Sequence, residues 1–260
     1  MNLDKYHDDT VQKLRKAGCV FAEDEASLLI SAALSYSELT VMVEKRVAGL
    51  PMEYVLGWAK FCGLKIKVDR GVFVPRRRTE FLVQQAKKRA KSGPIVVDLC
   101  CGTGALGVAL VSALDHYELH AADIDPLAVN CAHYNVTAVG GNVYEGDLFD
   151  PLPKRLRNHV DILMVNAPYV PTDEIEFLPA EAREYEATVS LDGGSDGLDI
   201  HRRVAAFTPL WLAPGGHLFV ETSERQASQT IEIFSRNGLN ARLVRCEEMD
   251  ATVVIGTKSA

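Results

Sequence analysis

The stretch that decides the fold is Asp98-Leu99-Cys100-Cys101-Gly102-Thr103-Gly104-Ala105-Leu106-Gly107, which follows an apolar run and opens an apolar helical pattern. Its glycines at 102, 104 and 107 match the GxGxxG spacing, which lets a backbone turn approach a ligand closely. The free N–H groups of a helix starting there would face the same ligand. This match alone is weak. Asp123 ends the next predicted strand about 20 residues later, where a carboxylate accepts hydrogen bonds from ribose hydroxyls, so together they predict a nucleoside cofactor.

The acidic residues around this loop favour S-adenosylmethionine over a dinucleotide. Asp98 would place a carboxylate beside the cofactor, where it repels a pyrophosphate but suits a sulfonium and an amino group. Asp147 follows the third predicted strand, where its carboxylate could accept a hydrogen bond from the adenine amino group. An equal alternative is that Asp147 caps a helix or a turn. The expected cofactor contacts are Asp98, Cys100, Cys101, Gly102, Thr103, Gly104, Asp123, Ile124, Asp147, Leu148 and Asn166.

From residue 95 onward, strands alternate with helices, which indicates a mostly parallel sheet with helices on both faces. Strands are expected at 95–99, 118–122, 142–145, 161–165 and 217–221, and helices at 104–114, 126–139, 198–212 and 225–237. The last two strands, 241–246 and 252–257, are too close in sequence for a crossover helix and should pair antiparallel. The fold class is therefore α/β, a Rossmann-like seven-stranded sheet ending in an antiparallel hairpin.

The chain before this sheet reads as a small helical unit followed by a linker. Helices are expected at 10–17, 23–34 and 38–48, then a β-hairpin at 61–74 with its turn at Asp69-Arg70-Gly71, and a basic helix at 79–91. We therefore predict a helical domain at 1–58 that docks the substrate, a linker at 59–93 and a catalytic domain at 94–260.

The tetrapeptide Asn166-Ala167-Pro168-Tyr169 follows the strand predicted at 161–165 and should face the cofactor loop, because ligands bind outside the carboxyl ends of parallel strands. Pro168 favours an extended Ala167, whose carbonyl can then point outward beside the Asn166 side chain. Two acceptors can bind both hydrogens of a planar –NH2 group while the Tyr169 ring lies against it. An ordinary Asn-x-Pro turn is the alternative.

This arrangement suits methyl transfer to nitrogen, with Asn166 and Tyr169 as the catalytic residues and all four residues of the tetrapeptide binding the substrate. A sulfonium methyl group is already electrophilic, so the protein mainly has to align a nitrogen lone pair with it. Such positioning contributes up to about 7 to 11 kcal/mol in favourable cases. Neither a metal nor a strong base is required, and we expect no metal site.

Composition narrows the remaining possibilities. The formal net charge of −7 argues against a general nucleic-acid binder. The segment between residues 71 and 93 is nevertheless basic, with seven Lys and Arg residues and one acidic residue. We interpret it either as a solvated helix face or as a cationic rim that guides a partner. Apolar runs are too short for a membrane span and the first residues do not resemble a signal peptide, so a cytoplasmic location is expected. The six scattered cysteines lack zinc-ligand spacing and should be reduced; for the adjacent pair Cys100-Cys101, small loop-fitting residues are favoured over a redox switch.

Several segments together resemble one known family. They are Val74-Pro75-Arg76-Arg77-Arg78-Thr79-Glu80, the loop from Asp98 to Gly107, Asp123-Ile124-Asp125-Pro126, Asn166 to Tyr169, Leu191-Asp192-Gly193-Gly194-Ser195-Asp196-Gly197-Leu198 and Leu212-Ala213-Pro214-Gly215-Gly216. From about residue 51 to residue 257 the chain resembles the HemK/PrmC family of protein glutamine N5-methyltransferases. The resemblance implies a helical N-terminal domain, a β-hairpin linker and a class I methyltransferase domain, with a translation release factor as the protein substrate.

The chain departs from the family pattern at several positions. Ala167 replaces the first proline of Asn-Pro-Pro-Tyr, Arg77-Arg78 replace a proline and an acidic residue, and Ala187 replaces the proline after Glu186. The loop Gly-Thr-Gly-Thr-Gly reads Cys100-Cys101-Gly102-Thr103-Gly104. These changes suggest a divergent branch and keep three alternatives open: a nucleobase amino group as methyl acceptor, a small molecule as acceptor, and a non-catalytic adaptor that retains the fold.

Overall fold

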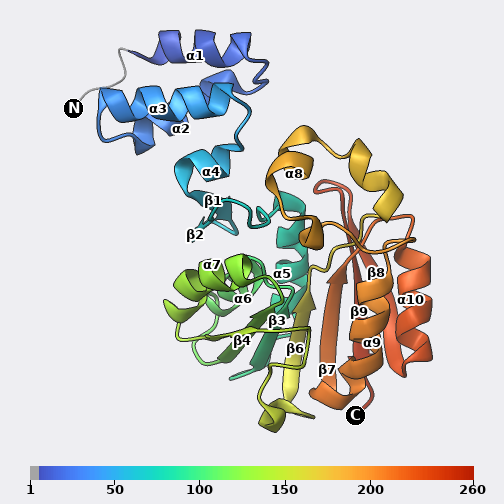
Figure 1. The fold of residues 1–260 in the computed structure, drawn as a ribbon. Helices are drawn as coiled ribbons and strands as arrows, with labels where there is room; N and C mark the ends of the chain where they lie inside the picture. The colour runs from blue at the N-terminus through green and yellow to red at the C-terminus, as the bar shows by residue number, and fades with distance from the viewer. Residues whose placement is uncertain (1–5) are drawn as a thin grey trace.

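The computed structural model describes residues 6–260 (Figure 1). The body of the protein is one seven-stranded sheet, whose strands are β3 (Ile95–Leu99), β4 (Glu118–Asp123), β5 (Asn142–Glu145), β6 (Val160–Val165), β7 (Leu212–Glu221), β8 (Leu239–Cys246) and β9 (Ala251–Lys258). Their order is β5-β4-β3-β6-β7-β9-β8, with β9 antiparallel to both neighbours and the other pairs parallel. The predicted mostly parallel sheet with an antiparallel ending is confirmed.

Helices cover both faces of the sheet, as its continuous apolar strands require. Side chains of α5 (Glu80–Lys87), α6 (Ala105–Val111) and α7 (Pro126–Thr137) pack in one core cluster, which contains Val96 of β3. Side chains of α9 (Asp199–Trp211) and α10 (Ala227–Arg236) contribute to a second cluster with Val97 and Leu99. Alternate residues of β3 therefore serve the two opposite faces of the sheet.

The strand order creates a binding crevice. β3 pairs with β4 on one side and with β6 on the other, so the chain reverses its direction across the sheet at this point. Ligands in open α/β sheets bind outside the carboxyl ends of the strands at such a switch point. The loops after β3, β4 and β6 all begin at this edge, and they carry the residues on which the functional prediction rests.

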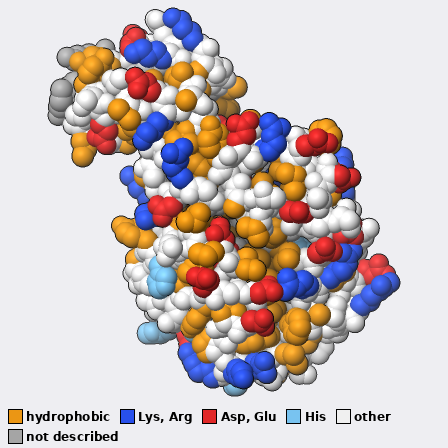
Figure 2. Space-filling model, viewed as in Figure 1, with side chains coloured by type: hydrophobic (Ala, Val, Ile, Leu, Met, Phe, Trp, Pro, Cys, Tyr) orange, Lys and Arg blue, Asp and Glu red, His pale blue; other side chains and the backbone are white. Residues whose placement is uncertain are grey.

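Residues 6–57 form four short helices: α1 (His7–Lys16), α2 (Ala22–Ala32), α3 (Tyr36–Val47) and α4 (Met52–Leu56). The first three share an apolar core around Leu14, Leu29 and Leu39, and they stand out from the body of the molecule (Figures 1 and 2). Arg46 of α3 forms ion pairs with Glu25 of α2 and with Glu181, which lies on α8 (Ala180–Tyr185). This arginine therefore links the helical unit to the body. Within residues 6–260, no helix has the length and apolar character needed to cross a membrane.

The hairpin is where the sequence prediction was wrong. Its strands are β1 (Trp58–Phe61) and β2 (Leu64–Lys67), so the turn lies at Cys62-Gly63 and not at Asp69-Arg70-Gly71. Cys62 and Gly63 have φ angles of 48° and 80°, the left-handed pair that a two-residue hairpin turn requires. The alternation at 64–68 belongs to the second strand, and a cysteine before the glycine is a weaker turn signal than asparagine or aspartate.

The remaining elements differ from expectation mainly in length. The basic helix begins as a 3-10 turn, η2 (Arg77–Thr79), and ends at Lys87 instead of residue 91. β7 begins at Leu212, five residues before the expected strand start. Five further elements were not predicted: α4, η3 (Lys154–Leu156), η4 (Thr172–Phe177), α8 and η5 (Thr188–Ser190). The last three lie in the long connection between β6 and α9.

Candidate functional site

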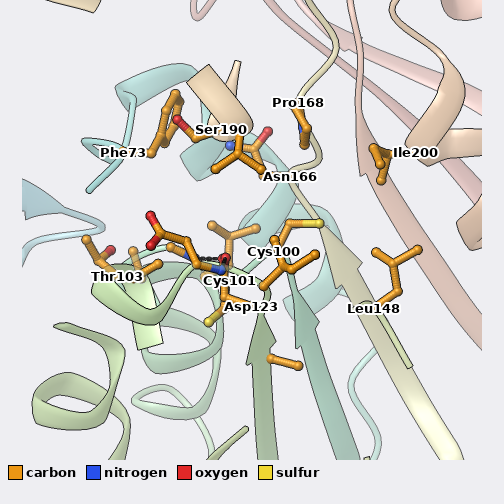
Figure 3. Close-up of a pocket in the computed structure, with 18 of the residues that line it drawn as sticks. Phe73, Cys100, Cys101, Thr103, Asp123, Leu148, Asn166, Pro168, Ser190 and Ile200 are labelled. Atoms are coloured by element: carbon orange, nitrogen blue, oxygen red, sulfur yellow. Dashed lines mark hydrogen bonds between the residues drawn. The ribbon is translucent and has the colours of Figure 1, made fainter. Parts of the chain in front are cut away.

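A cavity lies at the carboxyl ends of β3, β4 and β6 (Figure 3). We call it the strand-end cavity. Ten of the residues predicted from the sequence line it: Cys100, Cys101, Gly102, Thr103, Asp123, Ile124, Asp147, Leu148, Asn166 and Pro168. Residues from the four loops that follow β3, β4, β5 and β6 therefore meet at one site, as the strand order requires.

The glycine loop and Asp123 form one hydrogen-bonded unit in the floor of this cavity. The Oδ2 atom of Asp123 accepts a hydrogen bond from the Gly102 N–H at 2.8 Å, and its Oδ1 atom accepts one from the Asp125 N–H at 3.0 Å. Gly102 has a φ angle of 55°, and a Cβ atom there would meet nothing within 4 Å, which leaves open space above the loop. Because a carboxylate oxygen has two lone pairs, both Asp123 oxygens can still accept a further hydrogen bond from a ligand.

Asp98 and Gly104 lie behind the cavity wall. Asp98 is fully buried; its Oδ2 atom accepts a hydrogen bond from the Gly107 N–H at 2.9 Å, and its Oδ1 atom has no partner among residues 6–260. Burial raises the pKa of Asp98 to about 8, and the charge of Asp123 adds to this rise, while the Gly107 bond opposes it. A Cβ atom at Gly104 would lie 2.4 Å from Cγ2 of Val136. Both residues support the loop from behind, and their direct contact with the cofactor stays a prediction.

Two charged residues of the cavity lining form an ion pair, Asp147 and Arg203 of α9, at 2.5 Å. A residue of α9 therefore holds the Asp147 side chain in place. Leu148, the next residue, has a φ angle of 48°.

The tetrapeptide after β6 carries two unused acceptors. The Oδ1 atom of Asn166 is inaccessible to solvent and has no hydrogen-bond partner in the described chain. The carbonyl of Ala167 likewise accepts no hydrogen bond from residues 6–260. A buried acceptor without a partner is uncommon in a folded protein, because leaving it unpaired costs about 1 to 3 kcal/mol. The pair therefore offers a site for a donor that is not part of this chain.

A second cavity, which we call the outer cavity, adjoins the first. Ala167 and Tyr169 line it, together with Arg76, Arg78 and Met249. The two cavities share the residues Phe73, Asn166, Pro168 and Ser190, which Figure 3 labels. A ligand in the strand-end cavity and a second ligand in the outer cavity would therefore meet beside Asn166.

Comparisons with known proteins agree with this geometry. The family profile described as Methyltransferase small domain matches residues 63–184. The chain is 39% identical over 199 residues to a release factor glutamine methyltransferase from Geobacter sulfurreducens, covering 76% of this chain and 69% of that protein. The chain belongs to the release factor glutamine methyltransferase family. A relative of the same name from Thermodesulfovibrio yellowstonii is 32% identical over 206 residues, or 76% of this chain and 73% of the relative.

A solved structure shares the fold. A methyltransferase from Pyrococcus furiosus matches with a TM-score of 0.58 at 12% identity, covering 86% of this chain and 100% of that one. Membership of the family confirms the resemblance found in the sequence. The chain is therefore an S-adenosylmethionine-dependent methyltransferase. S-adenosylmethionine is the cofactor that the glycine loop and the acidic residues around it predicted.

Some lining residues of this family member were not predicted from the sequence. They are Phe73, Pro75 and Thr79 from the linker, Ser190 from η5, and Ile200 and Arg203 from α9. The linker residues lie in or beside the segment 74–80 that carries part of the family resemblance, and this signal could have identified them. Ile200 and Arg203 stand on an ordinary amphipathic helix, where the sequence carries no such signal.

The cysteine pair of the loop consists of free thiols in the described chain, as do the other four cysteines. Burial raises the pKa of the Cys100 and Cys101 thiols above their usual value. Because the thiolate is the reactive form, this burial disfavours redox chemistry at the pair. Among residues 6–260, no cluster of three or more His, Cys, Asp or Glu side chains could hold a metal ion.

Proposed function

We propose that this chain transfers the methyl group of S-adenosylmethionine to the side-chain amide nitrogen of a glutamine in a translation release factor, in the cytoplasm. The observation that carries the proposal is the buried, unpaired Oδ1 atom of Asn166, at the point where the two cavities meet. An amide –NH2 group is a donor of the kind that this acceptor lacks.

The strand-end cavity suits the methyl donor. The two free lone pairs of the Asp123 carboxylate would accept hydrogen bonds from ribose hydroxyls. Burial raises the pKa of both Asp98 and Asp123, and neither carboxylate has a cationic partner among residues 6–260. A sulfonium and an amino group would supply that charge, whereas a pyrophosphate would add to the repulsion. The residues in place therefore fit S-adenosylmethionine.

The outer cavity suits a planar amide. The Asn166 side-chain oxygen and the Ala167 carbonyl would each accept one amide N–H, and the Tyr169 ring would pack against the amide plane. Bound S-adenosylmethionine supplies an electrophilic methyl group. The task of the protein is then to hold the nitrogen lone pair in line with that methyl group, because the lone pair of an amide is delocalised and reacts poorly without such alignment.

A protein partner also fits the surface of the helical unit. Val20, Phe21 and Leu34 are 83%, 68% and 86% exposed at the ends of α2. Val20 and Phe21 precede α2 and Leu34 follows it, so exposed apolar side chains at both ends of this helix are available for contact with a protein partner. We include in the proposal that the helical domain, residues 1–58, docks the release factor.

A nucleobase amino group would fit the same acceptors but is less well supported by the surroundings. Two of the arginines beside the tetrapeptide already have acidic partners, since Arg76 pairs with Glu186 and Arg78 with Glu221. Basic and acidic side chains are interspersed over the face seen in Figure 2. Phosphate binding requires uncompensated cations, so the proposal includes no stable nucleic-acid partner.

The test is methylation of a purified release factor. The chain is incubated with isotope-labelled S-adenosylmethionine and a release factor, and the peptides are sequenced by mass spectrometry. We expect one labelled methyl group on a glutamine side chain, and none on a matched release factor in which that glutamine is replaced by asparagine, which is one methylene shorter. Label found only in nucleic acid or in a small molecule, or no label in the protein, would overturn the proposal.

A further inference from the structure

The Tyr169 hydroxyl is held by two charged side chains from distant parts of the chain. Nη2 of Arg78 donates a hydrogen bond to the Tyr169 hydroxyl at 2.6 Å, and this hydroxyl donates one to Oε1 of Glu221 at 3.2 Å. Nε of Arg78 donates to the same Glu221 oxygen at 3.2 Å, which closes a triangle. Arg78 lies on η2, before the catalytic sheet, while Glu221 ends β7.

Because Glu221 is buried, its carboxylate needs a cationic partner. Its side chain is 3% exposed, whereas that of Arg78 is 44% exposed. The second carboxylate oxygen, Oε2, is buried without a hydrogen-bond partner among the described residues. Arg78 forms the ion pair that compensates this carboxylate, and loss of one partner of a buried pair is strongly unfavourable. Glu221 therefore holds Arg78, and Arg78 in turn holds the tyrosine.

The tyrosine remains a donor in this setting. Burial and the neighbouring Glu221 raise the pKa of Tyr169 above its usual value. The hydroxyl thus keeps its proton and can donate to Glu221 while it accepts from Arg78. The Arg78 guanidinium also lies 6.0 Å from the centre of the Tyr169 ring, which adds a cation–π contact.

The backbone of Tyr169 is fixed separately. Nε2 of Gln226 donates hydrogen bonds to the Tyr169 carbonyl and to the Asp196 carbonyl, each at 2.9 Å. With its backbone anchored on one side and its hydroxyl on the other, the ring has one orientation. Ala167, two residues earlier, lacks the ring that fixes the backbone of a proline, so side-chain anchors from other elements define this loop.

We propose that Arg78 and Glu221 are positioning residues for methyl transfer, which act by holding the Tyr169 ring in the orientation that packs against the acceptor group. The proposal rests on the proposed function, because it assigns Tyr169 to the acceptor side of the site. It predicts that removing Arg78 and removing the Tyr169 hydroxyl slow methyl transfer for the same reason, so that removing both slows it no further. Cofactor binding should be unaffected, since the triangle lies outside the strand-end cavity.

A double-mutant cycle tests this prediction. Methyl transfer to the release factor is measured for Arg78→Gln, Tyr169→Phe and the combined variant, with Arg77→Gln as the matched control. Arg77 is exposed and makes no ion pair or side-chain hydrogen bond with residues 6–260. We expect each single change to lower kcat by at least about tenfold, the combined change to lower it no further, and the Kd for S-adenosylmethionine to stay constant. Additive losses, or an equal loss in the control, would overturn the proposal.

A second measurement works without a substrate. The chain contains eight tyrosines, and the fluorine signal of Tyr169 in 3-fluorotyrosine-labelled protein is identified by its loss in Tyr169→Phe. Arg78→Gln should broaden or shift this signal and leave the tyrosines of the helical unit unchanged; an unchanged Tyr169 signal would overturn the proposal. If Arg78→Gln fails to fold, Arg78→Gln combined with Glu221→Gln removes the unpaired charge and should give the same spectrum change. Wild-type protein that methylates no release factor contradicts the proposed function only, and the fluorine spectrum then decides the positioning role.

Discussion

The cofactor half and the acceptor half of the site are built in different ways. In the cofactor half, Asp98 binds the N–H of a residue nine positions later, and Asp123 binds one 21 positions earlier. In the acceptor half, Arg78 and Glu221 are 143 positions apart, and Gln226 is 57 positions from Tyr169. The glycine loop and Asp123 are therefore a local βαβ structure, although Asp147 of the same cavity pairs with Arg203, which is 56 positions away. The anchors of Tyr169 in the acceptor half, in contrast, all come from distant elements. This difference teaches that substitutions can alter the acceptor half while the cofactor half keeps its geometry.

The largest expected effect concerns Asp98. Its folded pKa of about 8 exceeds that of an unfolded aspartate, so the folded chain retains a proton that the unfolded chain releases. Stability supplied by this proton is present below about pH 4 and is lost as the pH rises to about 8, at about 1.4 kcal/mol per unit of pKa difference. Urea unfolding at pH 6 and pH 9 should show this loss, and Asp98→Asn should largely remove it. If the free energy of unfolding of Asp98→Asn fell as steeply with pH, the loss of stability could not be assigned to Asp98.

The next largest effect is expected from a substitution in the cofactor half, Asp123→Ala. Asp123→Ala removes the acceptors for the ribose and the bond to the Gly102 N–H, so the affinity for S-adenosylmethionine should fall by about 100-fold, or about 3 kcal/mol. Titration calorimetry measures it. Asp115→Ala, an exposed aspartate before β4, serves as the control and should bind the cofactor as the wild-type protein does. An Asp123→Ala variant with wild-type affinity would show that the loop does not bind the cofactor as argued.

Gln226→Ala should affect only the acceptor half. It leaves the carbonyls of Tyr169 and Asp196 without their shared donor, so the loop loses its anchor, and methyl transfer should fall by about tenfold. The Kd for S-adenosylmethionine should not change. The control is Gln229→Ala, because Gln229 is an exposed glutamine in the first turn of α10, the helix that Gln226 caps. A parallel loss of cofactor affinity in Gln226→Ala would show that the two halves are coupled.

The smallest effect is a gain in stability within the cofactor half. Cys100 has a φ angle of 53°, a left-handed conformation that costs a residue with a Cβ atom about 1 to 2 kcal/mol. Cys100→Gly should relieve this strain, although the added freedom of the unfolded chain offsets about 0.5 to 1 kcal/mol. A rise in the free energy of unfolding of about 1 kcal/mol or less is expected from denaturant titration. A clear loss of stability would mean that the buried thiol packs more favourably than its backbone strain costs.

The same division explains what could be predicted from the sequence. The strand positions, the mostly parallel sheet and the cavity residues around the glycine loop follow from periodicity and from a short spaced pattern, both of which are local signals. The hairpin turn was misplaced because Cys62-Gly63 carries a weak turn signal. The roles of Arg78, Glu221 and Gln226 could not be predicted, because each depends on contacts between elements that only the folded sheet brings together.

The basic segment shows how structure revised a charge pattern. From the sequence, the excess of Lys and Arg between 71 and 93 was either a solvated face or a rim for a partner. In the structure two of these partly exposed cations pair with buried carboxylates, Arg76 with Glu186 and Arg78 with Glu221. A count of charges carries no information on these partners, and contact between the segment and a protein partner stays a prediction.

The most direct test of the account is Asn166→Ala, measured for cofactor binding and for methyl transfer on the same protein preparation. Asn166 lines both cavities and carries the unpaired buried acceptor. We predict a Kd for S-adenosylmethionine within a few-fold of the wild-type value and a single-turnover rate of glutamine methylation reduced by at least about 100-fold. A variant that methylates glutamine at close to the wild-type rate would contradict the assignment of Asn166 as the group that seats the acceptor nitrogen.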